Sequence, residues 1–281
     1  MNEIWSSLGE GGVRLAVFVG VFVLLAVFEL AHPRRVLSVS KRQRWVTNWA
    51  IVAIDSAVVR AMSYLAVPIA AVAAAVAAEQ NGVGLLNWVE WPVGIEIFLA
   101  VVVLDLAIWA QHVASHKVPV LWRLHQMHHA DRDIDVTTAI RFHPIEIALS
   151  MVWKILCVVA LGASPLAVVV FEIILNAGAM FSHANIRLPL WLDRGLRAVI
   201  VTPDMHRVHH SIERHEHDSN YGFNLSIWDR VFGTYTDQPE KGHDAMTIGL
   251  KTFQSDGPSR LGWSLALPWR NGSRASEGQK P

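Results

Sequence analysis

The histidines constrain what this chain can fold into more than any other feature of its sequence. Residues at i, i+3 and i+4 lie on one face of a helix, so histidines at these spacings aim their imidazoles at a common point. Neutral imidazole is the commonest protein ligand for zinc, copper, iron and nickel. Eight of the fourteen histidines follow such spacings in three clusters: His112 and His116; His125, His128 and His129; His206, His209 and His210. The repetition predicts a metal site rather than isolated surface or core histidines.

The number of clustered histidines indicates more than one metal ion. A structural zinc ion takes about four ligands, and a catalytic one about three plus water. The clusters exceed that number, so we expect two ions with about four or five nitrogens each. Two more candidates are His143, in the segment Arg141-Phe142-His143-Pro144, and His183, in the segment Phe181-Ser182-His183-Ala184-Asn185. Each is expected to be either a ligand or a buried group held by hydrogen bonds.

The composition indicates a membrane protein. The chain has 281 residues and is 52% hydrophobic but only 17% charged, whereas a soluble domain carries about 25% charged residues. Lys plus Arg and Asp plus Glu are equal at 24 each, which gives no basis for nucleic-acid binding. Cys157 is the only cysteine, so an intramolecular disulfide, a zinc site built from cysteines and an iron–sulfur cluster are excluded.

Long apolar stretches are expected to cross the bilayer as helices. Residues 13–31 and 93–111 are almost wholly apolar and, at about 1.5 Å per residue, long enough to span it. The first stretch lacks the basic start and the small-residue end of a cleaved signal peptide, so we predict a retained helix. Residues 46–78 are mixed in character. They predict one long or broken helix that returns to the far side, with Asp55 and Arg60 facing protein rather than lipid.

Basic residues assign the two sides of the membrane. The loop of residues 32–45 carries five Lys and Arg, whereas the loop of residues 79–92 carries none. Cytoplasmic loops of membrane proteins are enriched in these residues. We therefore expect residues 32–45, and the first histidine cluster at the end of the 93–111 stretch, at the cytoplasmic face.

Residues 145–181 decide whether the histidine clusters can meet. A single crossing by this apolar stretch would place the last cluster on the opposite side of the membrane from the second. Residues 162–165, Gly-Ala-Ser-Pro, are typical of a turn and divide the stretch into two arms. We therefore predict a membrane hairpin that returns the chain to the cytoplasmic face. Lys154, within the first arm, is expected to snorkel or to mark a shallow, partly re-entrant hairpin.

Asp105 lies inside an apolar stretch, seven residues before His112. An acidic residue in a membrane helix is costly and usually functional, and metal-bound histidines commonly donate their second N–H to a carboxylate. Seven residues correspond to about 10 Å along a helix, so the expected partner is a histidine from another cluster. The alternative is a pair with Arg60 or a contact with another helix.

Taken in order, these motifs resemble the fatty acid hydroxylase / sterol desaturase superfamily of membrane di-iron proteins. The resemblance covers roughly residues 90–240. It includes the three histidine boxes, Arg141-Phe142-His143-Pro144, Asn220-Tyr221-Gly222, Trp228-Asp229 and Phe232-Gly233-Thr234-Tyr235. The first box has three intervening residues, a variant that the family shows. The resemblance also implies a ligand role for His183, because the family carries a further ligand histidine near this position.

The resemblance implies a function as well. In this family the boxes bind a non-haem di-iron centre that activates O2, and the reactions include hydroxylation and desaturation of lipid C–H bonds. We therefore expect two iron ions, O2 as co-substrate, a lipid substrate and no nucleic-acid partner. No cytochrome b5-like domain is recognisable in the sequence, so we expect electrons from a separate donor protein of the ferredoxin or cytochrome type.

Two other functions stay open on the sequence alone. A membrane zinc hydrolase would need a general-base glutamate within a box, as in HExxH, and none of the three boxes has one. A non-enzymatic metal-handling protein would place ligands along its membrane spans, whereas these histidines gather at one end. The sequence identifies neither the lipid nor the choice between hydroxylation and desaturation.

The expected fold is all-α. It is a multi-pass membrane helical bundle with a cytoplasmic, histidine-rich helical cap, in the inner or plasma membrane. We divide it into N-terminal membrane helices at residues 1–91, a histidine-box catalytic domain with a membrane hairpin at 92–240, and a C-terminal tail at 241–281. Residues from about 254 onward are rich in Ser, Gly, Pro and basic side chains, and we expect them to be loose.

Overall fold

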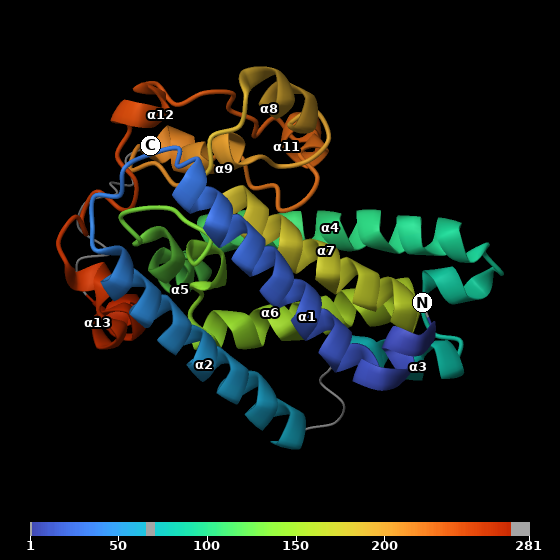
Figure 1. Ribbon diagram of the computed structural model, residues 1–281. Helices are drawn as coiled ribbons and strands as arrows, with labels where there is room; N and C mark the ends of the chain where they lie inside the picture. Colours follow the sequence, from blue (N-terminus) through green and yellow to red (C-terminus); the bar gives the residue numbers. More distant parts are fainter. Residues whose placement is uncertain (1, 66–70, 271–281) are drawn as a thin grey trace.

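The computed structural model describes residues 2–65 and 71–270, and within them the fold is all-helical, as predicted (Figure 1). The long helices are α1 (Asn2–Ala31), α2 (Lys41–Leu65), α3 (Ala71–Gln80), α4 (Val93–Lys117), α5 (Pro119–His129), α6 (Pro144–Leu161) and α7 (Pro165–His183). The short helices are α8 (Leu190–Leu196), α9 (Pro203–His209), α10 (Arg214–His217), α11 (Ile227–Val231), α12 (Gly242–Ala245) and α13 (Leu261–Ala266). Single 3-10 turns are η1 (Leu85–Trp88), η2 (Thr138–Ile140), η3 (Gly257–Ser259) and η4 (Leu267–Trp269).

Four segments of the described chain are long and apolar enough to cross a membrane. They are Gly11–Ala31 of α1 and the whole of α4, α6 and α7. The turn predicted between α6 and α7 is present, because Gly162 ends α6 in a left-handed conformation (φ 71°). Ser164 then caps α7 by accepting a hydrogen bond from the Ala167 N–H. The two helices form the predicted hairpin, and α7 returns to the end of the bundle where α9 lies (Figure 1).

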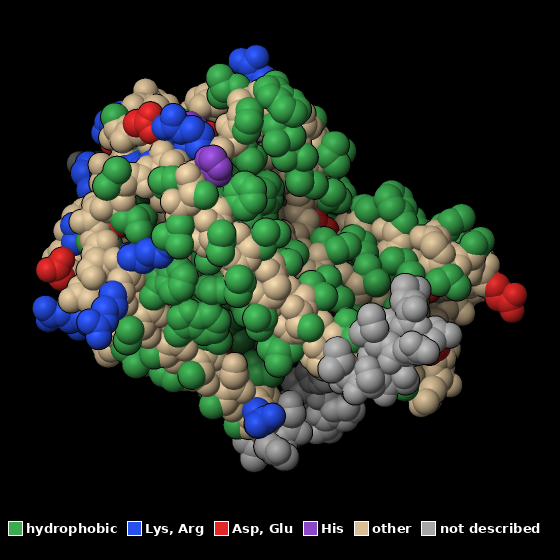
Figure 2. Space-filling model, viewed as in Figure 1, with side chains coloured by type: hydrophobic (Ala, Val, Ile, Leu, Met, Phe, Trp, Pro, Cys, Tyr) green, Lys and Arg blue, Asp and Glu red, His purple; other side chains and the backbone are tan. Residues whose placement is uncertain are grey.

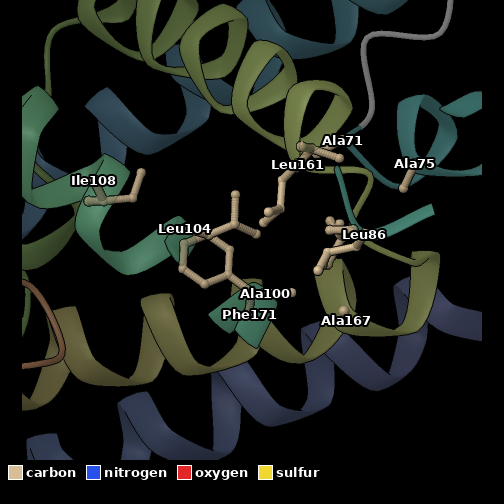
Figure 3. Packing of buried hydrophobic residues seen from close by; sticks show 12 residues of the cluster. Ala71, Ala75, Leu86, Ala100, Leu104, Ile108, Leu161, Ala167 and Phe171 are labelled. Atoms are coloured by element: carbon tan, nitrogen blue, oxygen red, sulfur yellow. The ribbon is translucent and has the colours of Figure 1, made fainter. Parts of the chain in front are cut away.

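The hairpin is fixed by packing on α4. Ala100 of α4 and Ala167 of α7 are fully buried, and Leu104 and Phe171 lie beside them (Figure 3). Small residues at helix interfaces let backbones approach closely in a membrane. Leu161, the last residue of α6, belongs to the same cluster. Both arms of the hairpin therefore share one core with α4.

Lys154 is held by an ion pair and not by snorkelling. Its ammonium group contacts the Glu172 carboxylate on the other arm of the hairpin, and Arg14 of α1 contacts the same carboxylate. This partner lies on another helix and leaves no signal near Lys154 in the sequence. The shallow, partly re-entrant hairpin stays a prediction.

The mixed segment of residues 46–78 contains most of α2 and α3. The junction between these helices, residues 66–70 with Pro68, lies outside the described residues, and so does the break expected there. Asp55 is buried, as expected for a group that faces protein, whereas Arg60 is exposed.

A cap covers one end of the spanning helices; it consists of the loop of residues 32–45, α5 and α8 to α13 (Figure 1). The loop is tied to the rest of the cap, since Arg34 pairs with Asp204 at 3.3 Å and Arg35 donates to the backbone oxygen of His243 at 2.9 Å. The basic loop and the third histidine cluster therefore lie on one side, as predicted. Figure 2 shows Lys and Arg side chains gathered at this end and apolar side chains over α1 and α2.

Residues 254–270 are not the loose segment that we expected. Leu267 is fully buried, and Arg141 donates to the backbone oxygen of Pro258 and to the hydroxyl of Ser264, both at 2.8 Å. The Ser, Gly and Pro residues here form tight turns around α13 and do not indicate disorder. Residues 271–281 lie outside the described chain.

Candidate metal centre

Nine buried histidines form two adjacent groups of potential metal ligands. The first group contains His112, His116, His125, His129 and His209, and the second contains His128, His183, His206 and His210. Within each group, one nitrogen from every residue lies within 4.8 Å of the others. The groups touch each other, since the ring centroids of His129 and His210 are 4.6 Å apart. The arrangement offers five and four nitrogens to two neighbouring ions.

Four helices bring these histidines together. α4 extends beyond the predicted apolar stretch to Lys117, so the first cluster occupies its last two turns. The second cluster lies at the end of α5, and the third lies on α9 and its C-cap. Thr202 caps α9 by accepting from the Met205 N–H. His183 is the last residue of α7, so the membrane hairpin itself supplies one member of the second group.

Backbone carbonyls determine which nitrogen of His112 and His209 carries the proton. The Nδ1 atoms lie 2.7 Å from the backbone oxygens of Tyr221 and Ser219, respectively. A carbonyl oxygen only accepts, so each Nδ1 donates and each neutral ring keeps a lone pair on Nε2. The two Nε2 atoms lie 3.1 Å apart. Two lone pairs that converge in this way repel each other, and a bound cation removes the repulsion.

The second group repeats this arrangement. His128 and His183 donate from Nδ1 to the backbone oxygens of Arg141 and Ala179, at 3.2 and 2.7 Å. Their Nε2 atoms lie 3.1 Å apart, and the Nε2 of His206 lies 3.0 Å from that of His183. Three imidazole nitrogens therefore converge on one place.

Burial keeps these imidazoles neutral. The pKa values of five cap histidines lie well below the ordinary 6.5, because burial disfavours the charged form and neighbouring histidines would add like charge: His128, His129, His206, His209 and His210. Both ring nitrogens of His129 and of His210 are buried with no hydrogen-bond partner among the described residues. Buried polar atoms are normally paired. Neutral, unpaired and convergent nitrogens fit a metal ion in each group.

Glu146 contacts the first histidine group, although its position in the sequence did not mark it as a candidate. Its Oε1 lies 2.6 Å from the Nδ1 of His125, so one histidine of the first group has a carboxylate partner. Such a carboxylate orients the ring and raises its basicity as a ligand. Glu146 lies in the first turn of α6, just after Pro144. The only local signal was an acidic residue at the start of an apolar helix.

His143 lies outside both histidine groups. Its side chain caps α6 by accepting from the Ile145 N–H, and its Nε2 lies 3.2 Å from the backbone oxygen of Leu265. Of the two roles left open for this residue, the contacts describe a buried group held by hydrogen bonds.

Asp105 also lies outside both groups. Its carboxylate accepts hydrogen bonds of 2.8–3.3 Å from Asn224, Leu225 and Trp228. Neither a histidine nor Arg60 is among its partners in the described part of the chain. Asp105 thus fastens the segment of residues 224–228 to α4.

Asp229 fastens the neighbouring segment to the same helix. Its carboxylate accepts from the indole N–H of Trp109 on α4 and from the backbone N–H groups of Tyr221 and Gly222, at 3.1, 2.9 and 2.8 Å. The backbone oxygen of Tyr221 orients His112. Asp229 therefore fixes the acceptor of one candidate ligand.

The loop of residues 131–141 supports the second group through Arg141, whose backbone oxygen orients His128. Arg44 is fully buried beneath this loop and donates to both carboxylate oxygens of Asp131 and to Asp135. The loop is therefore held by ion pairs inside the cap.

A cavity of about 1180 Å³ lies beside the first histidine group, and its wall includes His112 and His125. Most of the lining is apolar and comes from α1, α2, α4, α6 and α7. This volume exceeds the roughly 300–1,000 Å³ of typical small-molecule sites. The cavity can hold a long apolar chain with one end next to the histidines.

Comparison with known proteins gives consistent matches. Residues 97–234 match the family model described as fatty acid hydroxylase. The chain is 29% identical over 194 residues to ornithine lipid hydroxylase OlsE of Rhizobium tropici, which covers 68% of this chain and 56% of that protein. It is 29% identical over 157 residues to the alkylglycerol monooxygenase of Homo sapiens (53% of this chain, 33% of that protein). It is also 29% identical over 174 residues to fatty acid hydroxylase vlmA of Lecanicillium sp (57% and 47%).

These alignments span between 33% and 56% of the relatives' own lengths. No solved structure matches the chain significantly.

Proposed function

Because the chain belongs to the fatty acid hydroxylase / sterol desaturase superfamily, we propose that it is an O2-dependent membrane oxygenase that hydroxylates or desaturates a lipid C–H bond. The observation that carries the proposal is the convergence of unprotonated imidazole nitrogens in two neighbouring groups. The cavity beside them, and relatives named as lipid hydroxylases and monooxygenases, support a lipid substrate.

Iron is the metal proposed for both groups. Imidazole suits iron as well as zinc, but zinc has no redox chemistry to offer O2. The first ion would be held by His112, His116, His125, His129 and His209, and the second by His128, His183, His206 and His210. When bound, the two iron ions would supply the chemistry that activates O2. In hydroxylation, a C–H bond, O2, two electrons and two protons give an alcohol and water.

The chain's own residues bind, orient and exclude water. The carbonyls of Tyr221, Ser219 and Arg141 keep the ligating nitrogens unprotonated and aimed inward. The apolar cavity wall receives the hydrocarbon part of the lipid and keeps bulk water from the reacting carbon. Residues 92–240 form the catalytic part in this proposal.

Electrons would come from a separate donor protein of the ferredoxin or cytochrome type. The basic loop of residues 32–45 lies at the histidine end of the bundle, which supports a cytoplasmic site in the inner or plasma membrane. Cysteine labelling tests this orientation in a Cys157→Ala background. A membrane-impermeant maleimide should label Val83→Cys in intact cells and His215→Cys only after permeabilisation. Labelling of His215→Cys from outside would reverse the proposed topology.

The reaction is tested with the purified, iron-loaded protein, a chemical or protein reductant, membrane lipids and isotope-labelled O2. We expect lipid that contains one labelled oxygen atom, or a new double bond. His128→Ala and His209→Ala should lower the iron content and abolish the product, whereas His32→Ala, at an exposed histidine outside both groups, should change neither. Full iron content in the first two variants would contradict the ligand assignment. Lipid cleavage without O2 consumption would instead favour a hydrolase.

A further inference from the structure

Asp55 is a buried carboxylate that neither the fold nor the histidine groups use. It is 8% exposed, yet its Oδ1 is buried with no hydrogen-bond partner among the described residues. A buried polar atom without a partner is costly, and such atoms are normally paired. Asp55 lines the cavity that contains His112 and His125 in its wall. A ligand in this cavity can supply the missing donor.

No cation in the described chain forms an ion pair with Asp55. The charge that acts on it is that of Glu146, a second carboxylate. Of the basic residues on the same cavity wall, Lys154 is paired with Glu172, and Arg60 is exposed. No cation of the described chain therefore compensates Asp55, and burial together with Glu146 disfavours its charged form unless a ligand supplies a donor.

Glu146 extends this acceptor surface towards the metal centre. Its Oε1 is occupied by His125, whereas its Oε2 is buried without a partner among the described residues. The unpaired oxygens of Asp55 and Glu146 can each accept a hydrogen bond from a ligand. The part of the cavity next to His125 therefore selects a group that donates, such as a hydroxyl or an amine.

We propose that Asp55 binds a hydroxyl or amino group of the lipid substrate and so places the polar end of that lipid beside the metal centre. This inference rests on the proposed function, because it takes the cavity to be the substrate site. Asp55 and Glu146 interact electrostatically, and Glu146 contacts the candidate ligand His125 directly. A donor bound at Asp55 therefore lies near the centre, and the oxidised C–H bond belongs to the polar part of the lipid and not to the far end of its chain.

A substrate-binding role and a structural role for Asp55 differ in their effect on stability. Removing the Asp55 carboxylate breaks no hydrogen bond or ion pair with the described residues, so Asp55→Asn and Asp55→Leu should melt at or above the wild-type Tm. A structural role predicts a lower Tm in both variants.

Binding is tested with three tritiated probes that share one hydrocarbon chain. Hexadecanol and hexadecylamine carry a donor, and hexadecyl methyl ether has an oxygen that cannot donate. Each probe is bound to the metal-loaded, full-length protein in nanodiscs, without O2 or reductant. A hydrogen bond to a buried charged group corresponds to about ten- to hundredfold in affinity. Hexadecanol, hexadecylamine or both should therefore bind with an affinity that exceeds that of the ether by this factor.

The variants separate the two kinds of donor. Asp55→Leu should abolish the preference over the ether. Asp55→Asn keeps a neutral acceptor, so it should retain part of a preference for the alcohol and lose a preference for the amine. The control Gln43→Ala, at an exposed position on the same helix and outside the cavity wall, should bind all probes like the wild type.

Three results would overturn the proposal: equal binding of the ether and both donor probes by the wild type, no binding of any probe, or an unchanged preference in Asp55→Leu. A protein that shows the preference but oxidises no lipid in the separate O2 assay would count against the proposed function and leave Asp55 as a lipid-binding residue.

Discussion

Arg44→Met tests whether the loop that supports the second histidine group depends on one buried ion network. The Arg44 side chain is fully buried and donates to both carboxylate oxygens of Asp131, at 2.6 and 2.7 Å, and to Asp135 at 2.5 Å. It also donates to the backbone oxygen of Asp133 at 3.0 Å. Methionine fills a similar volume but leaves two buried carboxylates without their cation.

The expected loss of stability is large. Removing one partner of a buried ion pair costs about 3–5 kcal/mol, because the other charge stays buried. Two carboxylates are affected here, so we expect a loss near 5 kcal/mol, out of a total of roughly 5–15 kcal/mol for a native protein. The loss should reach the metal centre, because the loop ends at Arg141, whose backbone oxygen orients His128.

Thermal unfolding in detergent and iron content measure the two effects. Arg44→Met should lower both the Tm and the iron content. The double variant with Asp131→Asn should recover part of the Tm, because one unpaired charge is removed with its partner. Arg42→Met, at an exposed position on the same helix, is the matched control. A wild-type Tm and a wild-type iron content in Arg44→Met would refute the reasoning.

Three further variants test other parts of the fold by their melting curves. Gly84 has a φ of 101°, and a Cβ there would collide with the backbone of Gly162. Gly84→Ala should therefore lower the free energy of unfolding by roughly 1–3 kcal/mol or more. Gly94→Ala should not lower it, because Gly94 has open space around it. Burial lowers the pKa of His243 to about 4, only partly offset by Asp204. The contribution of His243 to the free energy of unfolding is therefore complete above pH ~6.5. It is lost as the pH falls from there towards 4, by up to about 1.4 kcal/mol per pH unit. His243→Gln should remove this pH dependence. Asp105→Asn turns an amide N–H₂ towards backbone and indole donors, so it should lower stability by about 1–3 kcal/mol. The iron content of the folded protein should not change. Loss of iron at an unchanged Tm would restore the predicted role of Asp105 beside a ligand.

The sequence predicted those features of the fold that depend on residues close together along the chain. The three histidine clusters fall on helices at i, i+3 and i+4, and a helix places such residues on one face whatever surrounds it. The turn at residues 162–165 follows from Gly162, which takes the left-handed conformation, and from Pro165, which fits the first turn of α7. The requirement that all clusters share one side of the membrane then determined the hairpin.

Contacts between distant segments could not be predicted in this way. Asp105 was expected to face a histidine, but its donors lie 119 to 123 residues later in the chain. The Glu172 partner of Lys154 and the packing of residues 254–270 on Arg141 are of the same kind. A residue's own neighbourhood in the sequence says nothing about which of several distant donors or cations will reach it, because tertiary packing decides that.

The segment Asn220-Tyr221-Gly222 contributes no side chain to either histidine group, yet it shapes the first group. Asn220 has a φ of 52°, in the left-handed region that asparagine tolerates better than most residues. Its amide group donates to the backbone oxygens of Met205 and Thr236 and so holds the turn in place. Gly222 has no space for a side chain, since a Cβ there would lie 2.8 Å from Val201.

This turn sets the tautomers of two candidate ligands through the shape of the backbone. The backbone oxygens of Ser219 and Tyr221 each lie 2.7 Å from the Nδ1 of a histidine, His209 and His112 respectively. Any residue can supply a carbonyl oxygen, so this contact places no demand on the side chains at these two positions. The residues that bend the chain are the ones that must be of a particular type: an asparagine that accepts a positive φ and a glycine that leaves room for its neighbours. Asn220 and Gly222 are therefore needed at these positions because they set the direction of the two neighbouring carbonyls. That direction leaves the Nε2 lone pairs of His112 and His209 aimed at one metal ion.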